Sequence, residues 1–217
     1  MMSTKSLLLA SVAIFGLSSS AGAAIAYLIP GGAVGTQNTF PGSLGMDFDV
    51  TAPQGISVTR LGAFDSGSDG IAGGNTISVG IFDRVTMAQV GASVTFTGTA
   101  GILEGGSRFL PITPINLPVG FQGSIVAQGY GGSEPNGNAG NGGAFGTTDD
   151  GGGAISFVGS SRFGDPAGGF TYPATPDGGL TNRYGAGTFD FAAIPEPGSA
   201  VLLLSALGLL AFPRRRR

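Results

Sequence analysis

Short apolar runs with a period of two residues, separated by glycine-rich breaks, constrain this chain more than any other feature. Apolar and polar residues alternate at 46–50, 77–81, 90–96 and 189–191, so each run has one apolar face. Such alternation is typical of antiparallel strands that pack on one side. No amphipathic helix of useful length interrupts the pattern. The chain is therefore predicted to be all-β.

The 42 glycines show no three-residue period, which excludes a collagen-like helix. Together with Pro, Asn and Asp they separate runs rich in Val, Ile, Thr and Phe, as turns separate short strands. We expect about eight to ten strands in residues 24–193, forming an antiparallel β-sandwich of jelly-roll-like form. Residues 131–153 are rich in Gly, Asn and Asp and poor in apolar side chains. We expect a flexible loop there, and a loop of this length can also carry a binding surface.

Two absences limit the chemistry of the chain. It has no cysteine and therefore no disulfide and no thiolate metal site. It has no histidine, which removes Ser-His-Asp and Cys-His catalysis, histidine metal sites and the commonest general base. Residues 24–193 carry five arginines and twelve acidic residues, a formal charge of −7. This is a poor surface for nucleic acid, which needs clustered Lys and Arg.

The N-terminus has the order of a secretory signal peptide. Lys5 precedes an apolar stretch from Leu7 to Leu17, and Ala21-Gly22-Ala23 fits a small-x-small cleavage site. A short buried helix is the alternative, but it does not account for this order. We expect signal peptidase to remove residues 1–23 during export.

The C-terminus has three parts: Pro195-Glu196-Pro197, an apolar run at 200–212, and the cluster Arg214, Arg215, Arg216 and Arg217. A transmembrane helix from Gly198 to Phe212 would span about 22 Å at 1.5 Å per residue. That is short of a hydrocarbon core of about 30 Å, so the arginines would have to snorkel or the bilayer to thin. Since arginines stay on the cytoplasmic side, the preceding domain is expected outside the inner membrane.

This tail, residues 194–217, resembles the PEP-CTERM sorting signal of Gram-negative bacteria. In that family a membrane-embedded, cysteine protease-like exosortase recognises and processes the tail, and the proteins are associated with exopolysaccharide and biofilm matrix. The resemblance implies an exosortase, the inner membrane and exopolysaccharide as partners, and a location at the cell surface or in the medium. An ordinary tail anchor would account for the apolar run and the arginines, but not for the tripeptide.

A second resemblance covers residues 44–130. LGMDFDVTAPQGISVTRLGAFDSGSDG followed by ISVGIFD is similar to a β-sandwich domain that recurs in PEP-CTERM proteins. An extended strand leads to a Leu-Gly-x-Phe-Asp segment, a glycine-rich turn and an apolar strand that ends in an aromatic residue and Asp. The resemblance supports the fold and implies no activity.

The segment from Asp65 to Gly70 is the most suggestive local cluster. Asp65 and Asp69 with Gly70 match the first, fifth and sixth positions of a calcium loop. The third and twelfth positions, Gly67 and Thr76, do not match. Asp65 and Asp69 are therefore Ca²⁺ candidates, and the alternative is a turn in which the Asp side chains bind nearby amides. No other cofactor is expected.

Two further sets of side chains bear on function. Tyr172 and Tyr184, with nearby Phe163 and Phe170, could form an exposed platform for a sugar, or could pin a long connection to the core. Glu104, Asp149 and Asp150 could serve glycoside hydrolysis, or could be solvated loop acids. Overall we expect a non-enzymatic, exported surface or matrix protein. A carbohydrate-binding module is the alternative, and a carboxylate hydrolase comes third.

Overall fold

The computed structural model of this protein describes residues 22–37, 40–139, 146–159, 161–180 and 182–196. The predicted apolar stretch of the signal peptide and the predicted membrane segment at 200–212 lie outside these residues. Within the described part of the chain, no helix is long and apolar enough to cross a membrane.

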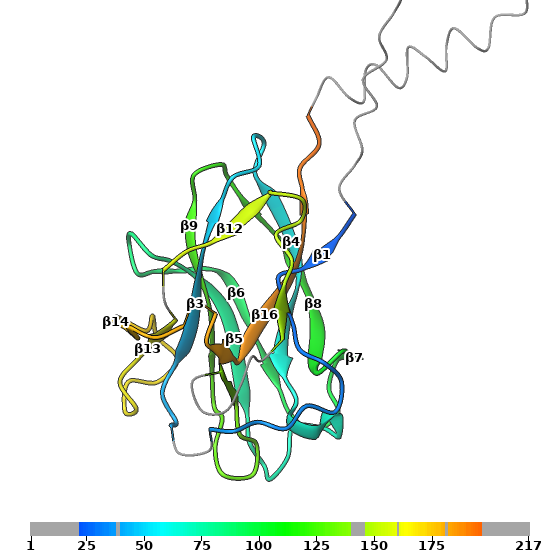
Figure 1. Cartoon of the computed structure of the whole chain (residues 1–217), viewed down its shortest axis with the longest axis vertical. Coiled ribbons are helices and arrows are strands. Elements are labelled where there is room, and N and C mark those ends of the chain that lie inside the picture. Colours follow the sequence, from blue (N-terminus) through cyan, green and yellow to red (C-terminus); the bar gives the residue numbers. More distant parts are fainter. Residues whose placement is uncertain (1–21, 38–39, 140–145, 160, 181, 197–217) are drawn as a thin grey trace, which may run out of the picture.

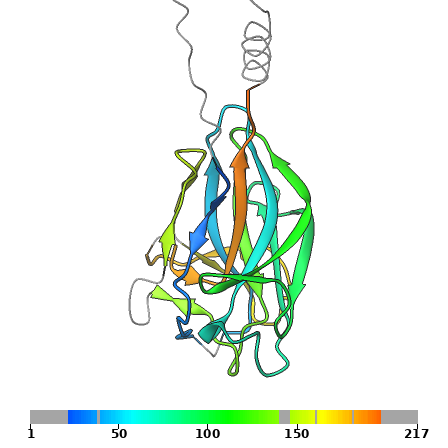
Figure 2. The same ribbon diagram turned by 90° about the vertical axis from the view of Figure 1, so that its right-hand side faces the viewer.

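Two antiparallel sheets make up most of the fold (Figures 1 and 2). The larger, seven-stranded sheet has the order β14 (Thr175–Pro176), β13 (Arg162–Phe163), β3 (Leu44–Val50), β9 (Gln122–Gln128), β5 (Ile77–Asp83) and β6 (Gln89–Phe96), and β12 (Ile155–Phe157) also pairs with β3. The five-stranded sheet has the order β1 (Ala24–Ile25), β16 (Gly187–Ala193), β4 (Ile56–Phe64), β8 (Ser107–Leu117) and β7 (Ile102–Glu104). Two short strand pairs complete the fold: β10 (Gly137–Asn138) with β15 (Tyr184–Gly185), and β11 (Thr147–Thr148) with β2 (Tyr27–Leu28).

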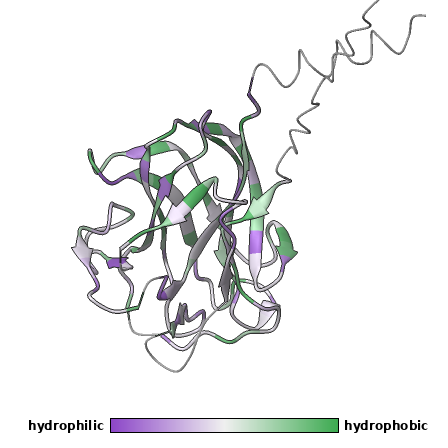
Figure 3. Cartoon of the chain, turned by 45° about the horizontal axis from the view of Figure 1, so that its top comes forward, coloured by the Kyte–Doolittle hydropathy of each residue, from purple (hydrophilic) through white to green (hydrophobic). Residues whose placement is uncertain are grey.

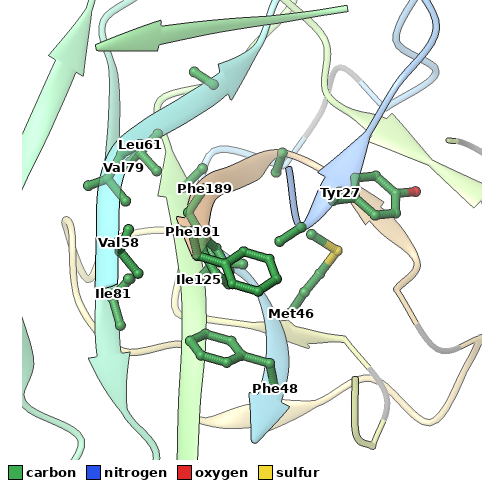
Figure 4. Packing of buried hydrophobic residues seen from close by; sticks show 14 of the residues in the cluster. Tyr27, Met46, Phe48, Val58, Leu61, Val79, Ile81, Ile125, Phe189 and Phe191 are labelled. Atoms are coloured by element: carbon green, nitrogen blue, oxygen red, sulfur yellow. The ribbon is translucent and has the colours of Figure 1, made fainter. Parts of the chain in front are cut away.

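The prediction of an all-β, antiparallel fold is confirmed. Hydrophobic and hydrophilic residues follow one another along the strands (Figure 3), and the apolar residues of both sheets meet in one core (Figure 4). Phe48 of β3 and Phe189 of β16 lie at its centre, with ring centroids 4.8 Å apart. Burying each such ring contributes about 1.5–3 kcal/mol. With no disulfide, this core is what holds the sheets together.

The larger sheet departs from simple alternation, because β3 and β9 are buried on both faces. Their outer face is covered by residues 164–174, here called the strap, which connect β13 to β14. Two glycines let the strap lie flat on the sheet. A Cβ at Gly45 would lie 2.8 Å from Pro173 Cγ, and one at Gly80 would lie 3.2 Å from the Phe170 ring. The larger sheet therefore packs against the core on one face and against the strap on the other.

One end of the domain gathers the turns 51–55, 117–121 and 150–154 with residues 194–196; we call it the neck. The amides of Thr51 and Ala52 donate to the Ala154 carbonyl, and the amide of Ile194 donates to the Gly55 carbonyl. Strand β1 begins beside the end of β16, with Ala24 opposite Phe191. The described chain thus begins near the neck and ends at it (Figures 1 and 2).

Candidate functional site

Strand β16 leads directly into the predicted sorting motif. Ala193 pairs with Ile56, and the Ile194 amide donates to the Gly55 carbonyl oxygen at 2.9 Å. Pro195 and Glu196 follow, and both are exposed. Pro197 and Arg214 to Arg217 lie outside the described residues. The first two residues of the motif are thus presented to solvent at the neck, one residue after the final strand.

Asp65 is fully buried, and its oxygens are already engaged. Both accept the Gly70 amide hydrogen, at 3.0 Å each, and Oδ2 also accepts from Arg108 Nε at 2.6 Å. Asp69 is exposed. The geometry matches the turn interpretation, because a cation at Asp65 would have to displace Arg108. In the described ranges no three acidic, His or Cys side chains are grouped so that they could hold a metal.

Glu134 also belongs to this site, although no sequence feature pointed to it. It is buried, and its Oε1 and Oε2 accept the amide hydrogens of Ser66 and Ala72, each at 2.7 Å. Burial raises the pKa of the Glu134 carboxyl; the two amide donors oppose this, and the charges of Asp65 and Asp69 reinforce it. The loop 66–72 is therefore clamped by two buried carboxylates, one at its base and one from a distant segment.

The segment that carries Glu134 differs from its prediction. Residues 131–139 were expected to belong to a flexible loop, yet Glu134, Asn136 and Asn138 are at most 1% exposed. Asn138 pairs with Tyr184 through β10 and β15, and Asn136 exchanges backbone hydrogen bonds with Gln37. Composition is a poor guide here because polar hydrogen bonds, not apolar burial, order the segment.

Tyr172 is part of the strap and faces the larger sheet, so it does not form an exposed platform. It is 9% exposed and packs against Phe82 and Val126 of the larger sheet. The Arg162 guanidinium lies 5.5 Å from the centre of its ring, and Arg162 Nε donates to Asp47 Oδ2 at 2.6 Å. Burial raises the pKa of the Tyr172 hydroxyl. The platform prediction is wrong for this residue, because the ring pins the strap to the sheet.

Tyr184 is also buried, at 4% exposure, and takes part in a separate network. Its hydroxyl donates to Asp177 Oδ2 at 2.6 Å, and Arg183 Nη1 donates to the same oxygen at 2.8 Å. Arg183 Nε donates to Asn138 Oδ1 at 2.8 Å. Burial, followed by the hydrogen bond to Asp177, raises the pKa of the Tyr184 hydroxyl. The second platform residue thus ties β15 to residues 137–139 and 177.

The carboxylates considered for hydrolysis are not brought together. Glu104 binds Arg60, which also donates to Asp190, at the end of β4 far from the neck. Asp149 and Asp150 accept amide hydrogens from glycines of the turn that follows them, and Asp150 lies at the neck. The hydrogen bond from Arg60 lowers the pKa of the Glu104 carboxyl, which is the reverse of what a general acid needs.

Every arginine in the described part of the chain forms an ion pair within the domain. The pairs are Arg60 with Glu104 and Asp190, Arg84 with Asp47 and Asp49, Arg108 with Asp65, Arg162 with Asp47, and Arg183 with Asp177. Except for Arg183 and Asp177, which are six residues apart, each pair joins segments distant in sequence. These arginine side chains therefore make contacts within the folded domain.

A scan of protein-family models and searches of curated proteins and solved structures returned no match to this chain.

Proposed function

We propose that this chain is an exported, non-enzymatic surface or matrix protein that is sorted through a PEP-CTERM signal at 194–217. Signal peptidase removes residues 1–23, the apolar tail holds the protein in the inner membrane, and an exosortase processes the tail. The domain then acts at the cell surface or in an exopolysaccharide matrix. Its two sheets and shared core support a β-sandwich of jelly-roll-like form.

The exposure of Pro195 and Glu196 directly after β16 carries the proposal. Proline has no backbone N–H and a fixed φ, so Pro195 cannot extend the hydrogen-bond ladder of β16. Pro195 and Glu196 therefore stand outside the folded sheet, where a processing enzyme can bind them. A structural role for the domain is supported by its charges, since the arginines that the structure describes and the buried acids Asp65 and Glu134 all serve internal contacts.

The test is the intact mass of the protein recovered from the envelope and the medium of its native host. We expect a mass that lacks both ends, with the new C-terminus near 195–197. Glu196→Ala should leave Arg217 in place and keep the chain in the membrane fraction. Gln54→Ala, an exposed change on the same neck, should be processed like the natural chain. A natural chain that retains Arg217 would identify the tail as a permanent anchor and contradict the proposal.

Carbohydrate binding through Tyr172 and Tyr184 is not favoured, because both rings are buried and engaged. A glycan array with the exported protein tests the alternative directly. Saturable binding that survives Tyr172→Phe and Tyr184→Phe would place a sugar site elsewhere on the domain.

A further inference from the structure

Resting on the proposed membrane tail, we propose that the neck faces the lipid bilayer while the tail is anchored, and that the opposite end of the domain points away from it. The bilayer that holds the chain's own tail thus lies next to the neck surface. The opposite end comprises the loops 31–37, 65–70 and 105–107, which meet where β4 ends at Phe64.

The length of the connecting chain is the first observation. Ile194 is still hydrogen-bonded to Gly55 within the neck. Only residues 195–199 separate it from the apolar run that starts at Ala200. Five residues span at most about 17 Å when fully extended. The neck therefore cannot move further than this from the point at which the tail enters the membrane.

The length of the domain is the second observation. Strand β4 runs from the neck to the opposite end over nine residues, a distance of about 30 Å. The connection is shorter than the domain, and its two prolines stiffen it. The far loops can approach the membrane only if the whole domain lies down on its side.

The neck has no positive charge that could attract it to lipid. Its residues include Asp150 and Glu196, with Asp149 adjoining, and no Lys or Arg. Anionic lipid therefore repels the neck, and charge does not draw this end toward the bilayer. The neck does expose Val119, which is 55% accessible at the tip of a turn. The short connection, and not adhesion, keeps this end toward the bilayer.

The absence of cysteine makes the test direct, since a single introduced thiol labels one place. Val119→Cys marks the neck, and Val34→Cys, 64% exposed, marks the opposite end. Each full-length variant is reconstituted into vesicles of neutral and anionic phospholipid that carry a quencher on the headgroup. Flotation shows whether the chain stays with the vesicles. We expect the label at 119 to be quenched several-fold more than the label at 34.

Equal quenching of the two labels on floated vesicles, or the reverse order, would overturn the orientation while leaving the tail intact. Failure to float would refute the membrane tail, and the orientation with it. Inserting twenty Gly and Ser residues after Ile194 should reduce the difference, because the longer connection lets the domain turn. A difference that persists in this variant would contradict the argument from chain length.

Discussion

At the residue scale, Glu134 shows how a single buried carboxylate orders a loop. Its two oxygens accept the amide hydrogens of Ser66 and Ala72. Replacing it by Ala leaves both donors without an acceptor, so we expect Glu134→Ala to lower the free energy of unfolding by about 2–4 kcal/mol. Chemical denaturation measures this.

Asp83 offers a matched control, because it accepts the amide hydrogens of Val85 and Thr86 in a hairpin turn in contact with solvent. Water can replace a lost acceptor there, so Asp83→Ala should have a much smaller effect. Equal losses for the two variants would show that burial of Glu134 is not what matters.

The four tyrosines give a second prediction at this scale. Burial raises the pKa of Tyr27 to about 12, and Tyr130, Tyr172 and Tyr184 are shifted in the same direction. Unfolded tyrosine ionises at about pH 10. Stability should therefore be unaffected by these groups below that pH and fall as the pH rises above it.

The chain has no tryptophan, so its ultraviolet absorbance reports the phenolates cleanly. We expect no ionisation step near pH 10 in the folded protein, and a cooperative step when it unfolds at higher pH. The same titration in denaturant should give the ordinary pKa. A tyrosine that titrates normally in the folded chain would show that its ring is accessible.

At the scale of elements, the strap depends on Gly45 of β3. A Cβ there would lie 2.7 Å from Ser124 Oγ and 2.8 Å from Pro173 Cγ. Gly45→Ala should therefore lift the strap and cost about 1–3 kcal/mol, as overpacking does. Limited trypsin digestion should then cut faster at Arg162. Gly132→Ala, where a Cβ meets nothing within 4 Å, should change neither property.

At the scale of the whole molecule, ion pairs join strands within each sheet and the loops beside them, and their contribution depends on pH. The hydrogen bond from Arg60 lowers the pKa of Glu104. A carboxyl with a lowered folded pKa contributes stability above its unfolded pKa, and this is lost as the pH falls through the folded value. The melting temperature should therefore decrease as the pH drops below about 4.5. Glu104→Gln should flatten this dependence; an unchanged profile would show that the pair contributes nothing.

The fold class followed from the sequence because the side-chain period of a strand is purely local. The runs at 46–50, 77–81 and 189–191 became β3, β5 and β16 for that reason. Asp65 could be assigned only to a metal or a turn, since the choice depended on Arg108, which is distant in the chain. For Tyr172 and Tyr184 the sequence left open an exposed platform or rings that pin a connection to the core, because their surroundings resemble exposed loops in composition; the structure shows the second.

The sequence alone determined the all-β class and the antiparallel sheets, and it predicted the export and sorting signals, because these depend on the order of nearby residues. Only the tertiary structure decided which polar groups are buried, what the strap covers, and that β16 delivers Pro195 and Glu196 to the neck. Those properties depend on contacts between segments far apart in the chain. A run of residues does not encode its partner segment; packing and hydrogen bonding of the whole domain select it.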